Sequence, residues 1–480
     1  MINLIYGGAS HPATDNHSFQ RMNPITGAVA SEAAAASPAD AIAAADAAAA
    51  AAPEWAALGP NARRAALLKA ADAVAARADA FTAAMMEETG ATAAWAGFNV
   101  NLAASMLREA AALTTQVTGE VIPSDKPGCL SMALRQPVGV VLGIAPWNAP
   151  VILGVRALAT PLACGNAVVF KASEICPRTH ALIAEALAEA LPSGVVSLLT
   201  NAPEDAAEIV GTLIDHPAIR RVNFTGSTKV GRIIAERCAR NLKPALLELG
   251  GKAPLIVLKD ADLDEAVKAA IFGAFFNQGQ ICMSTERIIL APEIADEFVA
   301  RFTARAATLK AGDPRDGSAP LGAVVDAVTV DKVSALIADA RDKGATIHSA
   351  GAAEGVLMPA QVVDHVTPDM RIYAEESFGP VVAIIRAQDE ADAVRLANDS
   401  DYGLSAAVFT RDIARGLVVA GQIRSGICHI NGATVHDEAQ MPFGGVGDSG
   451  YGRFGGRAGI AEFTDLRWIT AETQPGTFPL

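Results

Sequence analysis

The sequence lacks the features of membrane proteins and of nucleic-acid-binding proteins. No apolar run reaches the length of a membrane span, and the first eight residues lack a basic region followed by an apolar one. We therefore expect neither a membrane segment nor a signal peptide. Basic residues are in the minority, since 38 Lys and Arg against 52 Asp and Glu give a net charge of −14. Nucleic acid phosphates bind to basic surfaces, so this balance argues against a nucleic acid partner.

Cysteine is also scarce. None of the six cysteines forms a C-x-x-C pair, and a chain of 480 residues can fold without covalent staples. We therefore expect no disulfide and no structural metal, and a reducing cytoplasm as the compartment. The cysteines are Cys129, Cys164, Cys176, Cys238, Cys282 and Cys428.

The length and the hydrophobic pattern predict an α/β protein with two or more domains. Apolar residues at helical spacing predict helices over Pro60–Glu88 and Ala94–Gln116, and the alanine-rich Ala33–Ala52 is interpreted as a further helix. From Gly139 onward, short β-branched runs alternate with helical stretches, which is typical of a buried parallel sheet. The expected strands are Val140–Ile144, Ala167–Phe170, Val195–Leu199, Arg221–Phe224, Leu255–Leu258, Arg287–Leu290, Val381–Ile385 and Ala406–Phe409.

A thiol and a carboxylate stand in two glycine-containing segments that could form a covalent catalyst. Cys282 ends the run Gln278-Gly279-Gln280-Ile281-Cys282, and Glu248 lies in Leu247-Glu248-Leu249-Gly250-Gly251-Lys252. A thiolate can attack an electrophilic carbon, and a carboxylate can activate the water that releases the product. An arbitrary cysteine is more often a small buried hydrophobe. No His occurs in Ile281–Arg287, which weakens a cysteine-protease interpretation.

Seven motifs occur in order along nearly the whole chain. Together they resemble the NAD(P)-dependent aldehyde dehydrogenase superfamily, whereas each alone would be a weak signal. The motifs are Pro146-Trp147-Asn148, Phe170-Lys171-Ala172-Ser173-Glu174, Phe224-Thr225-Gly226-Ser227-Thr228-Lys229-Val230-Gly231, Leu247-Glu248-Leu249-Gly250-Gly251-Lys252, Gln278-Gly279-Gln280-Ile281-Cys282, Glu376-Ser377-Phe378-Gly379-Pro380 and Pro442-Phe443-Gly444-Gly445.

The resemblance implies a division of the chain into domains. A variant Rossmann cofactor-binding domain is expected over residues 1–118 and 138–247, and a catalytic α/β domain over residues 248–463. A return of the C-terminal part of this second domain to the first one stays open. Residues 119–137 and 464–480 are expected to form a β arm that makes a homodimer or a homotetramer.

The resemblance also implies catalytic roles. Cys282 would form a thiohemiacetal with an aldehyde and, after hydride loss, a thioester. Glu248 would activate the water that hydrolyses the thioester, which favours a free acid as product over an acyl-coenzyme A. Asn148 and the backbone N–H of Cys282 would stabilise the oxyanion. The alternatives are a surface carboxylate for Glu248 and a helix N-cap before Pro150 for Asn148.

The cofactor segment departs from the usual dinucleotide fingerprint, because Thr228 replaces the middle glycine of G-x-G-x-x-G. A strand followed by a helix still suits a pyrophosphate at the helix N-terminus. Glu174 would accept hydrogen bonds from ribose hydroxyls and repel a 2′-phosphate, so NAD is expected, with NADP possible but less preferred. The implied cofactor-binding residues are Ile144, Pro146, Trp147, Lys171, Ser173, Glu174, Gly226, Ser227, Gly231, Leu249, Glu376 and Phe378.

Trp95, Arg156 and Tyr451 resemble residues of salicylaldehyde and vanillin dehydrogenases, which implies an aromatic, hydroxylated aldehyde and a role in aromatic catabolism. The guanidinium of Arg156 could bind a ring hydroxyl or phenolate, and Arg156 is equally well interpreted as a helix-surface arginine paired with a carboxylate. A broad aliphatic or semialdehyde dehydrogenase, an inactive binding or structural protein with the same fold, and a hydrolase that uses Cys282 stay open as alternatives. Further candidates for the substrate pocket are Phe98, Met106, Phe276, Cys428 and Phe454.

Overall fold

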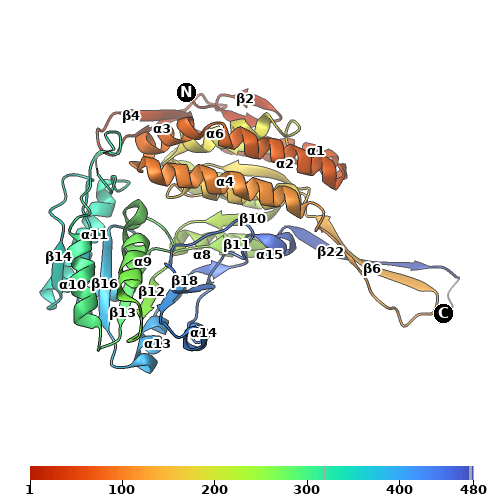
Figure 1. Ribbon diagram of the computed structural model, residues 1–480. Coiled ribbons are helices and arrows are strands. Elements are labelled where there is room, and N and C mark those ends of the chain that lie inside the picture. Colours follow the sequence, from red (N-terminus) through yellow and green to blue (C-terminus); the bar gives the residue numbers. More distant parts are fainter. Residues whose placement is uncertain (318, 475–477, 479–480) are drawn as a thin grey trace.

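The computed structural model describes residues 1–317, 319–474 and 478. Two mostly parallel sheets, each flanked by helices, make up the body of the molecule, and a β arm projects from it (Figure 1). This arrangement confirms the expected α/β fold class. In the described part of the chain, no helix is both long enough and apolar enough to cross a membrane.

The first sheet has the strand order β2-β1-β9-β8-β7-β10-β11-β21. Its five central strands are parallel. Three of them, β7, β8 and β9, are buried along their whole length because their sequences are mostly apolar. The chain leaves β7 toward β8 and β9, then returns to the other side of β7 as β10, so the topology switches direction there. The strands are β1 (Leu4–Tyr6), β2 (Ala9–His11), β7 (Val140–Ile144), β8 (Ala167–Lys171), β9 (Val196–Leu199), β10 (Ile219–Thr225), β11 (Ala245–Glu248) and β21 (Gly450–Tyr451).

Helices cover this sheet on both faces. On one face α1 packs on β8 and β9, and on the other α5 packs on β7 and β8 with α4 outside it. Ser37 caps α1 through a reciprocal pair of hydrogen bonds with Asp40, which fixes where the helix begins. The helices of this half are α1 (Pro38–Ala57), α2 (Pro60–Ala75), α3 (Ala78–Thr89), α4 (Ala93–Leu113), α5 (Pro150–Ala163), α6 (Pro177–Ala188), α7 (Ala206–Asp215), α8 (Thr228–Arg240) and α15 (Gly456–Glu462), with a 3₁₀ turn at Pro203–Asp205.

The second sheet has the order β14-β15-β16-β13-β12-β18-β19, and only the edge pair β14–β15 is antiparallel. Its strands are β12 (Ala253–Val257), β13 (Thr285–Leu290), β14 (Thr346–Ser349), β15 (Gln361–Asp364), β16 (Val381–Arg386), β18 (Ser405–Phe409) and β19 (Ile427–Ile430). Its helices are α9 (Leu263–Phe275), α10 (Ala295–Ala306), α11 (Ala327–Asp342), α12 (Arg371–Ala374), α13 (Glu390–Asn398) and α14 (Ile413–Ala420), with a 3₁₀ turn η2 at Phe276–Gly279.

The β arm is a three-stranded antiparallel sheet. Its long strands β6 (Cys129–Pro137) and β22 (Thr464–Glu472) pair along their whole length, and β5 (Glu120–Val121) flanks β6. Figure 1 shows that the arm extends away from both halves. Residues 475–477, 479 and 480 of the expected arm lie outside the described part of the chain.

The first 90 residues differ from the expected helices in three places. Four short strands were not predicted, among them β3 (Ser18–Met22) and β4 (Val29–Ala34). The helix expected over Ala33–Ala52 begins only at Pro38, because the first two alanines end β4. The helix expected over Pro60–Glu88 is two helices, since the backbone of Arg77 leaves the helical conformation between α2 and α3.

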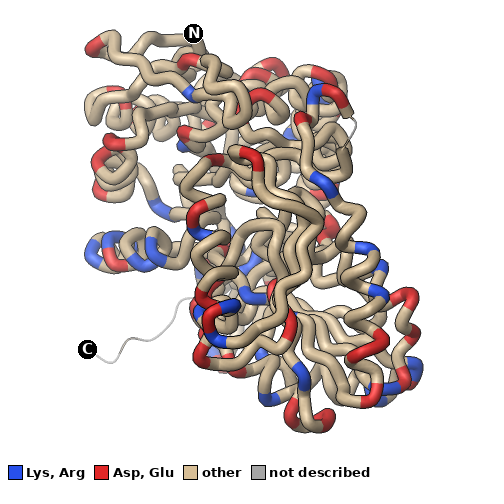
Figure 2. Tube along the Cα trace, turned by 90° about the vertical axis from the view of Figure 1, so that its left-hand side faces the viewer, with Lys and Arg blue, Asp and Glu red and all other residues tan. Residues whose placement is uncertain are grey.

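Charged residues of both signs are spread along the chain. Figure 2 shows Asp and Glu as well as Lys and Arg on both halves of the molecule. The negative net charge is therefore distributed over the molecule.

The minor strands β17 (Tyr402–Gly403) and β20 (Val446–Gly447) pair with each other beside the second sheet.

Candidate active site

Neighbouring parallel strands of the first sheet bring two of the three predicted catalytic residues to one edge. Asn148 follows β7, Ser227 follows β10, and Glu248 is the last residue of β11. The carboxyl ends of parallel strands meet at one edge of a sheet, and the crevice at the topological switch between β7 and β10 is where α/β sheets bind ligands. The sequence thus folds two distant motifs into one crevice.

The third residue, Cys282, comes from the second half. It lies in the loop between η2 and β13. Asn277 and Gln278 in η2 have φ values of 50° and 56°, so this turn holds two non-glycine residues in the left-handed region. Gln278 donates a hydrogen bond from Nε2 to the backbone oxygen of Ala323 at 2.8 Å. Such contacts to neighbouring segments hold the turn in a strained conformation.

The two glycines after Glu248 let the two halves approach each other. A Cβ atom on Gly251 would collide with the backbone oxygen of Cys282, and one on Gly250 would lie 2.9 Å from the carboxylate of Glu376. The Gly251 N–H donates to Glu376 Oε1 at 2.8 Å. These contacts explain why the Leu-Glu-Leu-Gly-Gly-Lys motif requires glycine at both positions.

Asn148 is fixed by residues of three elements. Its Nδ2 donates to the backbone oxygen of Gln280 at 3.1 Å, so its amide faces the Cys282 loop. Its own backbone oxygen accepts hydrogen bonds from Trp95 Nε1 at 2.9 Å and from Asn277 Nδ2 at 3.0 Å. The N-cap alternative is wrong, because Ala149 occupies the N-cap position of α5.

Glu248 and Cys282 form an electrostatically coupled pair. Glu248 is buried, and neither of its carboxylate oxygens has a hydrogen-bond partner among the described residues. Burial raises the pKa of Glu248 to about 7, although the Cys282 thiol and the Arg156 charge partly offset the effect. Burial, followed by the Glu248 charge, raises the pKa of the half-buried Cys282 thiol well above its usual value. Glu248 therefore titrates near neutrality beside the thiol and can accept a proton there.

Two cavities meet at Cys282. The edge cavity is lined by residues that include Pro146, Trp147, Gly226, Leu249, Glu376 and Phe378. The aromatic cavity is lined by residues that include Trp95, Phe98, Ile152, Phe272, Val435 and Phe443. Asn148 and Cys282 line both cavities, so the Cys282 thiol can be reached from two sides.

The edge cavity suits a dinucleotide. Gly226 and Ser227 line it at the start of α8, and the Ser227 hydroxyl caps this helix by accepting from the Val230 N–H. A helix N-terminus with a small-residue turn is a favourable site for phosphate groups. Trp147 and Phe378 offer apolar faces, with their rings at 84° and their centroids 5.8 Å apart.

The remaining predicted cofactor residues are not among those that line this cavity, and they lie on β7, β8, α8 and the loop after β8. Lys171 and Ser173 are at the end of β8, where Lys171 forms an ion pair with Glu174, which also accepts from Asn201 Nδ2 at 3.0 Å. Ile144 is the buried last residue of β7. Gly231 lies in α8, where an added Cβ would be 2.5 Å from the Leu249 side chain.

An ion pair that the sequence reasoning missed supports the Glu376–Phe378 segment. Lys252 and Glu286 are buried and joined at 2.6 Å. Glu286 also accepts the backbone N–H groups of Ser377 and Phe378, at 3.0–3.1 Å and 3.0 Å. Phe378 has a φ of 51°, an unusual conformation that these hydrogen bonds stabilise. The available signal was Lys252 itself, a charged residue at the end of the Glu248 motif and directly before an apolar run.

Aromatic rings form one wall of the aromatic cavity. Trp95 stacks on Phe98 with centroids 5.6 Å apart, and Phe276 packs edge-on against Trp95 at 5.0 Å. Arg156 also lines the cavity and forms a buried ion pair with Asp437. The arginine is therefore buried inside the fold, where it has a carboxylate partner that the sequence did not reveal.

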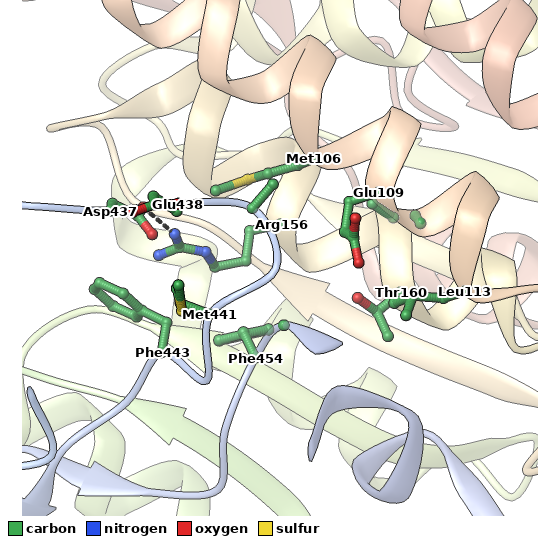
Figure 3. Close-up of a pocket in the computed structure, with 14 residues that line it drawn as sticks. Met106, Glu109, Leu113, Arg156, Thr160, Asp437, Glu438, Met441, Phe443 and Phe454 are labelled. Carbon is green, nitrogen blue, oxygen red and sulfur yellow. Dashed lines mark hydrogen bonds and ion pairs between the residues drawn. The ribbon is translucent and has the colours of Figure 1, made fainter. Parts of the chain in front are cut away.

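The structure does not bring every predicted substrate residue to this cavity. Met106 and Phe454 line a smaller side cavity next to Arg156 (Figure 3). Tyr451 lies in β21 beside β11 and is 50% exposed, and Cys428 lies in β19. Among the described residues, neither of these two lines the edge, aromatic or side cavity, because both belong to strands that end elsewhere.

Comparisons with known proteins agree with this geometry. A model of the aldehyde dehydrogenase family matches residues 11–469. The chain is 59% identical over 480 residues to a vanillin dehydrogenase of Pseudomonas fluorescens, covering 100% of this chain and 99% of that protein. It is 53% identical over 478 residues to a salicylaldehyde dehydrogenase of Pseudomonas putida, covering 99% of each.

A solved structure is also similar to this chain over its whole length. The salicylaldehyde dehydrogenase from Pseudomonas putida G7, complexed with salicylaldehyde, matches with a TM-score of 0.98 and 51% identity, over 100% of this chain and 99% of that one. These matches confirm the resemblance inferred from the seven motifs. The chain therefore belongs to the aldehyde dehydrogenase family, whose enzymes oxidise aldehydes with NAD or NADP.

Proposed function

We propose that this enzyme oxidises an aromatic, ring-hydroxylated aldehyde to the carboxylate with NAD. The observation that carries the proposal is the position of Cys282 between an aromatic cavity and a cavity suited to a dinucleotide. The aldehyde enters from the first and the cofactor from the second, so the reacting carbon lies between them. The similarity to vanillin and salicylaldehyde dehydrogenases supports the aromatic substrate.

Cys282 acts as the nucleophile in this proposal. Its proton passes to Glu248, which lies beside the thiol with both carboxylate oxygens unpartnered. The thiolate attacks the aldehyde carbon and forms a thiohemiacetal. The Asn148 amide, which faces the Cys282 loop, then donates to the negative oxygen.

Glu248 acts a second time when the product leaves. Glu248 first releases the Cys282 proton to solvent. Once the carbon has reached the thioester level, the carboxylate takes a proton from water, and the hydroxide formed attacks the thioester. The tetrahedral intermediate expels the Cys282 thiolate and releases the acid. A pKa of about 7 suits a group that must alternately accept and release a proton near neutral pH.

The edge cavity holds the cofactor. Gly226 and Ser227 at the N-terminus of α8 would bind the pyrophosphate, and Glu376 and Phe378, which line the same cavity, would hold the ribose and the ring of the nicotinamide. When bound, the nicotinamide ring supplies a hydride acceptor. Glu174 holds the adenine ribose and disfavours a 2′-phosphate, which makes NAD the preferred cofactor.

Two further statements belong to this proposal. The arm formed by β5, β6 and β22 joins subunits into a homodimer or homotetramer, as its exposed apolar side chains suggest. The six cysteines are free thiols, which suits the reducing cytoplasm as the compartment.

A panel of aldehydes tests the substrate class. NADH formation is measured for benzaldehyde, its hydroxylated derivatives, straight-chain aldehydes and a semialdehyde, and kcat/KM is compared. We expect the aromatic aldehydes to have the highest kcat/KM, because Trp95, Phe98 and Phe272 line the cavity. Higher values for the aliphatic aldehydes or the semialdehyde would support the broad-specificity alternative.

A further inference from the structure

A buried ion pair separates the aromatic cavity from the side cavity. Arg156 on α5 and Asp437 in the loop after β19 have side chains only 5% and 6% exposed, and both residues line both cavities. The guanidinium carbon of Arg156 lies 4.1 Å from the centroid of the Phe443 ring. Figure 3 shows the pair joined above Phe443, with Glu109 and Thr160 on the other side of Arg156 in this view.

One carboxylate oxygen of Asp437 has no role within the fold. Oδ2 accepts from Arg156 Nη2, whereas Oδ1 is buried and has no hydrogen-bond partner among the described residues. Burial raises the pKa of Asp437, and the Arg156 charge only partly offsets this. An unpartnered buried acceptor costs free energy, and a ligand that donates a hydrogen bond there recovers it.

We propose that Asp437 is a specificity-determining residue whose Oδ1 accepts a hydrogen bond from the ring hydroxyl of the aldehyde. The inference rests on the proposed oxidation of aromatic aldehydes. It assigns to Asp437, through its free oxygen, the recognition that the sequence suggested for Arg156. Arg156 then acts as a positioning residue that holds Asp437 through their ion pair.

Recognition by Arg156 and recognition by Asp437 differ in which partner donates the hydrogen bond. An arginine only donates hydrogen bonds, so it would donate to a methoxy oxygen on the ring as readily as to a hydroxyl oxygen. A carboxylate only accepts, so it requires the hydroxyl hydrogen and gains nothing from a methoxy group. Both substituents donate electrons to the ring, so the reactivity of the aldehyde carbon stays comparable. A site built to accept from a hydroxyl discriminates strongly against analogues that lack it.

The experiment compares kcat/KM for 2-, 3- and 4-hydroxybenzaldehyde with the matching methoxybenzaldehydes, at a pH where the phenols are neutral. We expect the wild-type enzyme to prefer the hydroxyl form at one or more ring positions. In Asp437→Asn the hydroxy-to-methoxy ratio should fall by about 10-fold to 100-fold, as expected when a hydrogen bond to a charged group is lost. Rejection of a methoxy group by its size alone would leave the ratio unchanged.

A control and a second variant keep the result interpretable. Glu109→Gln removes a carboxylate that lines only the side cavity, and we expect it to leave the ratio unchanged. If Asp437→Asn does not fold, the double variant Arg156→Leu/Asp437→Leu replaces the whole ion pair by apolar side chains, a change that buried pairs often tolerate. This double variant should lower the hydroxy-to-methoxy ratio of kcat/KM by a factor similar to that of Asp437→Asn.

Three results would overturn the inference. The ratio could be the same in the wild type and the Asp437 variants, or kcat/KM could fall equally for both substrates, or the control could lose the preference as well. A wild-type enzyme that oxidises none of these hydroxy- and methoxybenzaldehydes overturns the proposed function and this inference with it. One that oxidises the hydroxybenzaldehydes without preferring them to the methoxy forms overturns this inference alone.

Discussion

At the scale of single residues, the central feature of the site is the carboxyl group of Glu248, whose ionisation is unfavourable in its buried position. Glu248 is buried with both oxygens unpartnered, and its pKa is raised to about 7. A carboxyl whose pKa is higher in the folded state than in the unfolded chain stabilises the fold while it is protonated. This stabilisation is lost as the pH rises from about 4.5, the ordinary pKa of glutamate, through about 7, the pKa of Glu248 in the folded state.

The first prediction is that Glu248→Gln makes the protein more stable in mildly alkaline solution. Glutamine cannot ionise, so at pH 8 the variant avoids a buried charge that costs up to about 3 kcal/mol. Its thermal unfolding midpoint should exceed that of the wild type at pH 8, whereas the two should converge near pH 4.5. A difference that does not change with pH would show that the Glu248 charge is not the cause.

The second prediction concerns the choice between NAD and NADP. Glu174 pairs with Lys171 at the end of β8, so Glu174→Gln removes a negative charge from the proposed ribose site. The ratio of kcat/KM for NAD to that for NADP should fall, by about tenfold if one charge repulsion is lost. Glu185→Gln on the exposed side of α6 is the control and should keep the wild-type ratio. The same ratio in all three proteins would exclude Glu174 from the ribose site.

At the scale of elements, the position of α8, the helix proposed to bind the cofactor, depends on its packing against Leu249, which directly follows β11. A Cβ on Gly231 would lie 2.5 Å from the Leu249 side chain, whereas one on Gly97 in α4 would meet nothing within 4 Å. Glycine weakens a helix by roughly 1 kcal/mol relative to alanine, so alanine is favourable wherever there is room for it.

The third prediction follows from this comparison. Gly97→Ala should raise the unfolding midpoint slightly, whereas Gly231→Ala should lower it and raise the KM for NAD, since α8 must shift away from Leu249. The measurements are thermal unfolding and steady-state kinetics of both variants. Equal gains in stability would mean that α8 accommodates the methyl group without moving.

Elements with one strong local signal could be predicted from the sequence, and those fixed by distant contacts could not. The eight expected strands all exist with ends shifted by up to two residues, because buried parallel strands are nearly continuous apolar runs. The break between α2 and α3 at Arg77 has no glycine or proline to mark it. The left-handed backbone conformation of Asn277 and Gln278 could not be predicted either, since the contacts that hold these residues come from other segments.

The catalytic motifs and three residues that line the aromatic cavity, Trp95, Phe98 and Arg156, were recognised in the sequence, but the contact between Arg156 and Asp437 was not. Asn148 and Cys282 stand in motifs that the sequence displays, and the fold brings them together. Arg156 and Asp437 are 281 residues apart, and nothing local indicates that they meet. Tyr451 stands near other pocket candidates in the sequence, yet its strand takes it to a different surface.

At the scale of the whole molecule, the chemistry lies where the two halves meet. Asn148 and Glu248 belong to the first sheet and Cys282 to the loop before β13 of the second sheet. The arm extends from this body and exposes large apolar side chains, with Leu466 61% and Val121 72% exposed. Exposed apolar side chains on a paired β arm are typical of a surface that another subunit covers.

The fourth prediction is that Leu466→Asp weakens self-association. A charge on the outer face of β22 would have to be desolvated in a subunit interface. Light scattering on a sizing column should give a smaller mass for the variant than for the wild type at the same concentration. Arg467→Asp, also on β22 but already polar, serves as the comparison. A wild-type protein that is monomeric throughout would contradict the proposed role of the arm.

Covalent catalysis at this junction can be measured directly by intact-protein mass spectrometry of Glu248→Gln mixed with NAD and benzaldehyde. We predict one equivalent of NADH in a burst that is slower than the first turnover of the wild type, because Glu248 no longer accepts the thiol proton. The protein mass should increase by one benzoyl group, located on Cys282, because thioester hydrolysis lacks its base. Cys282→Ala should give neither the burst nor the added mass. Sustained turnover by Glu248→Gln without any acyl adduct, or turnover by Cys282→Ala, would contradict a covalent Cys282 mechanism with Glu248 as the base.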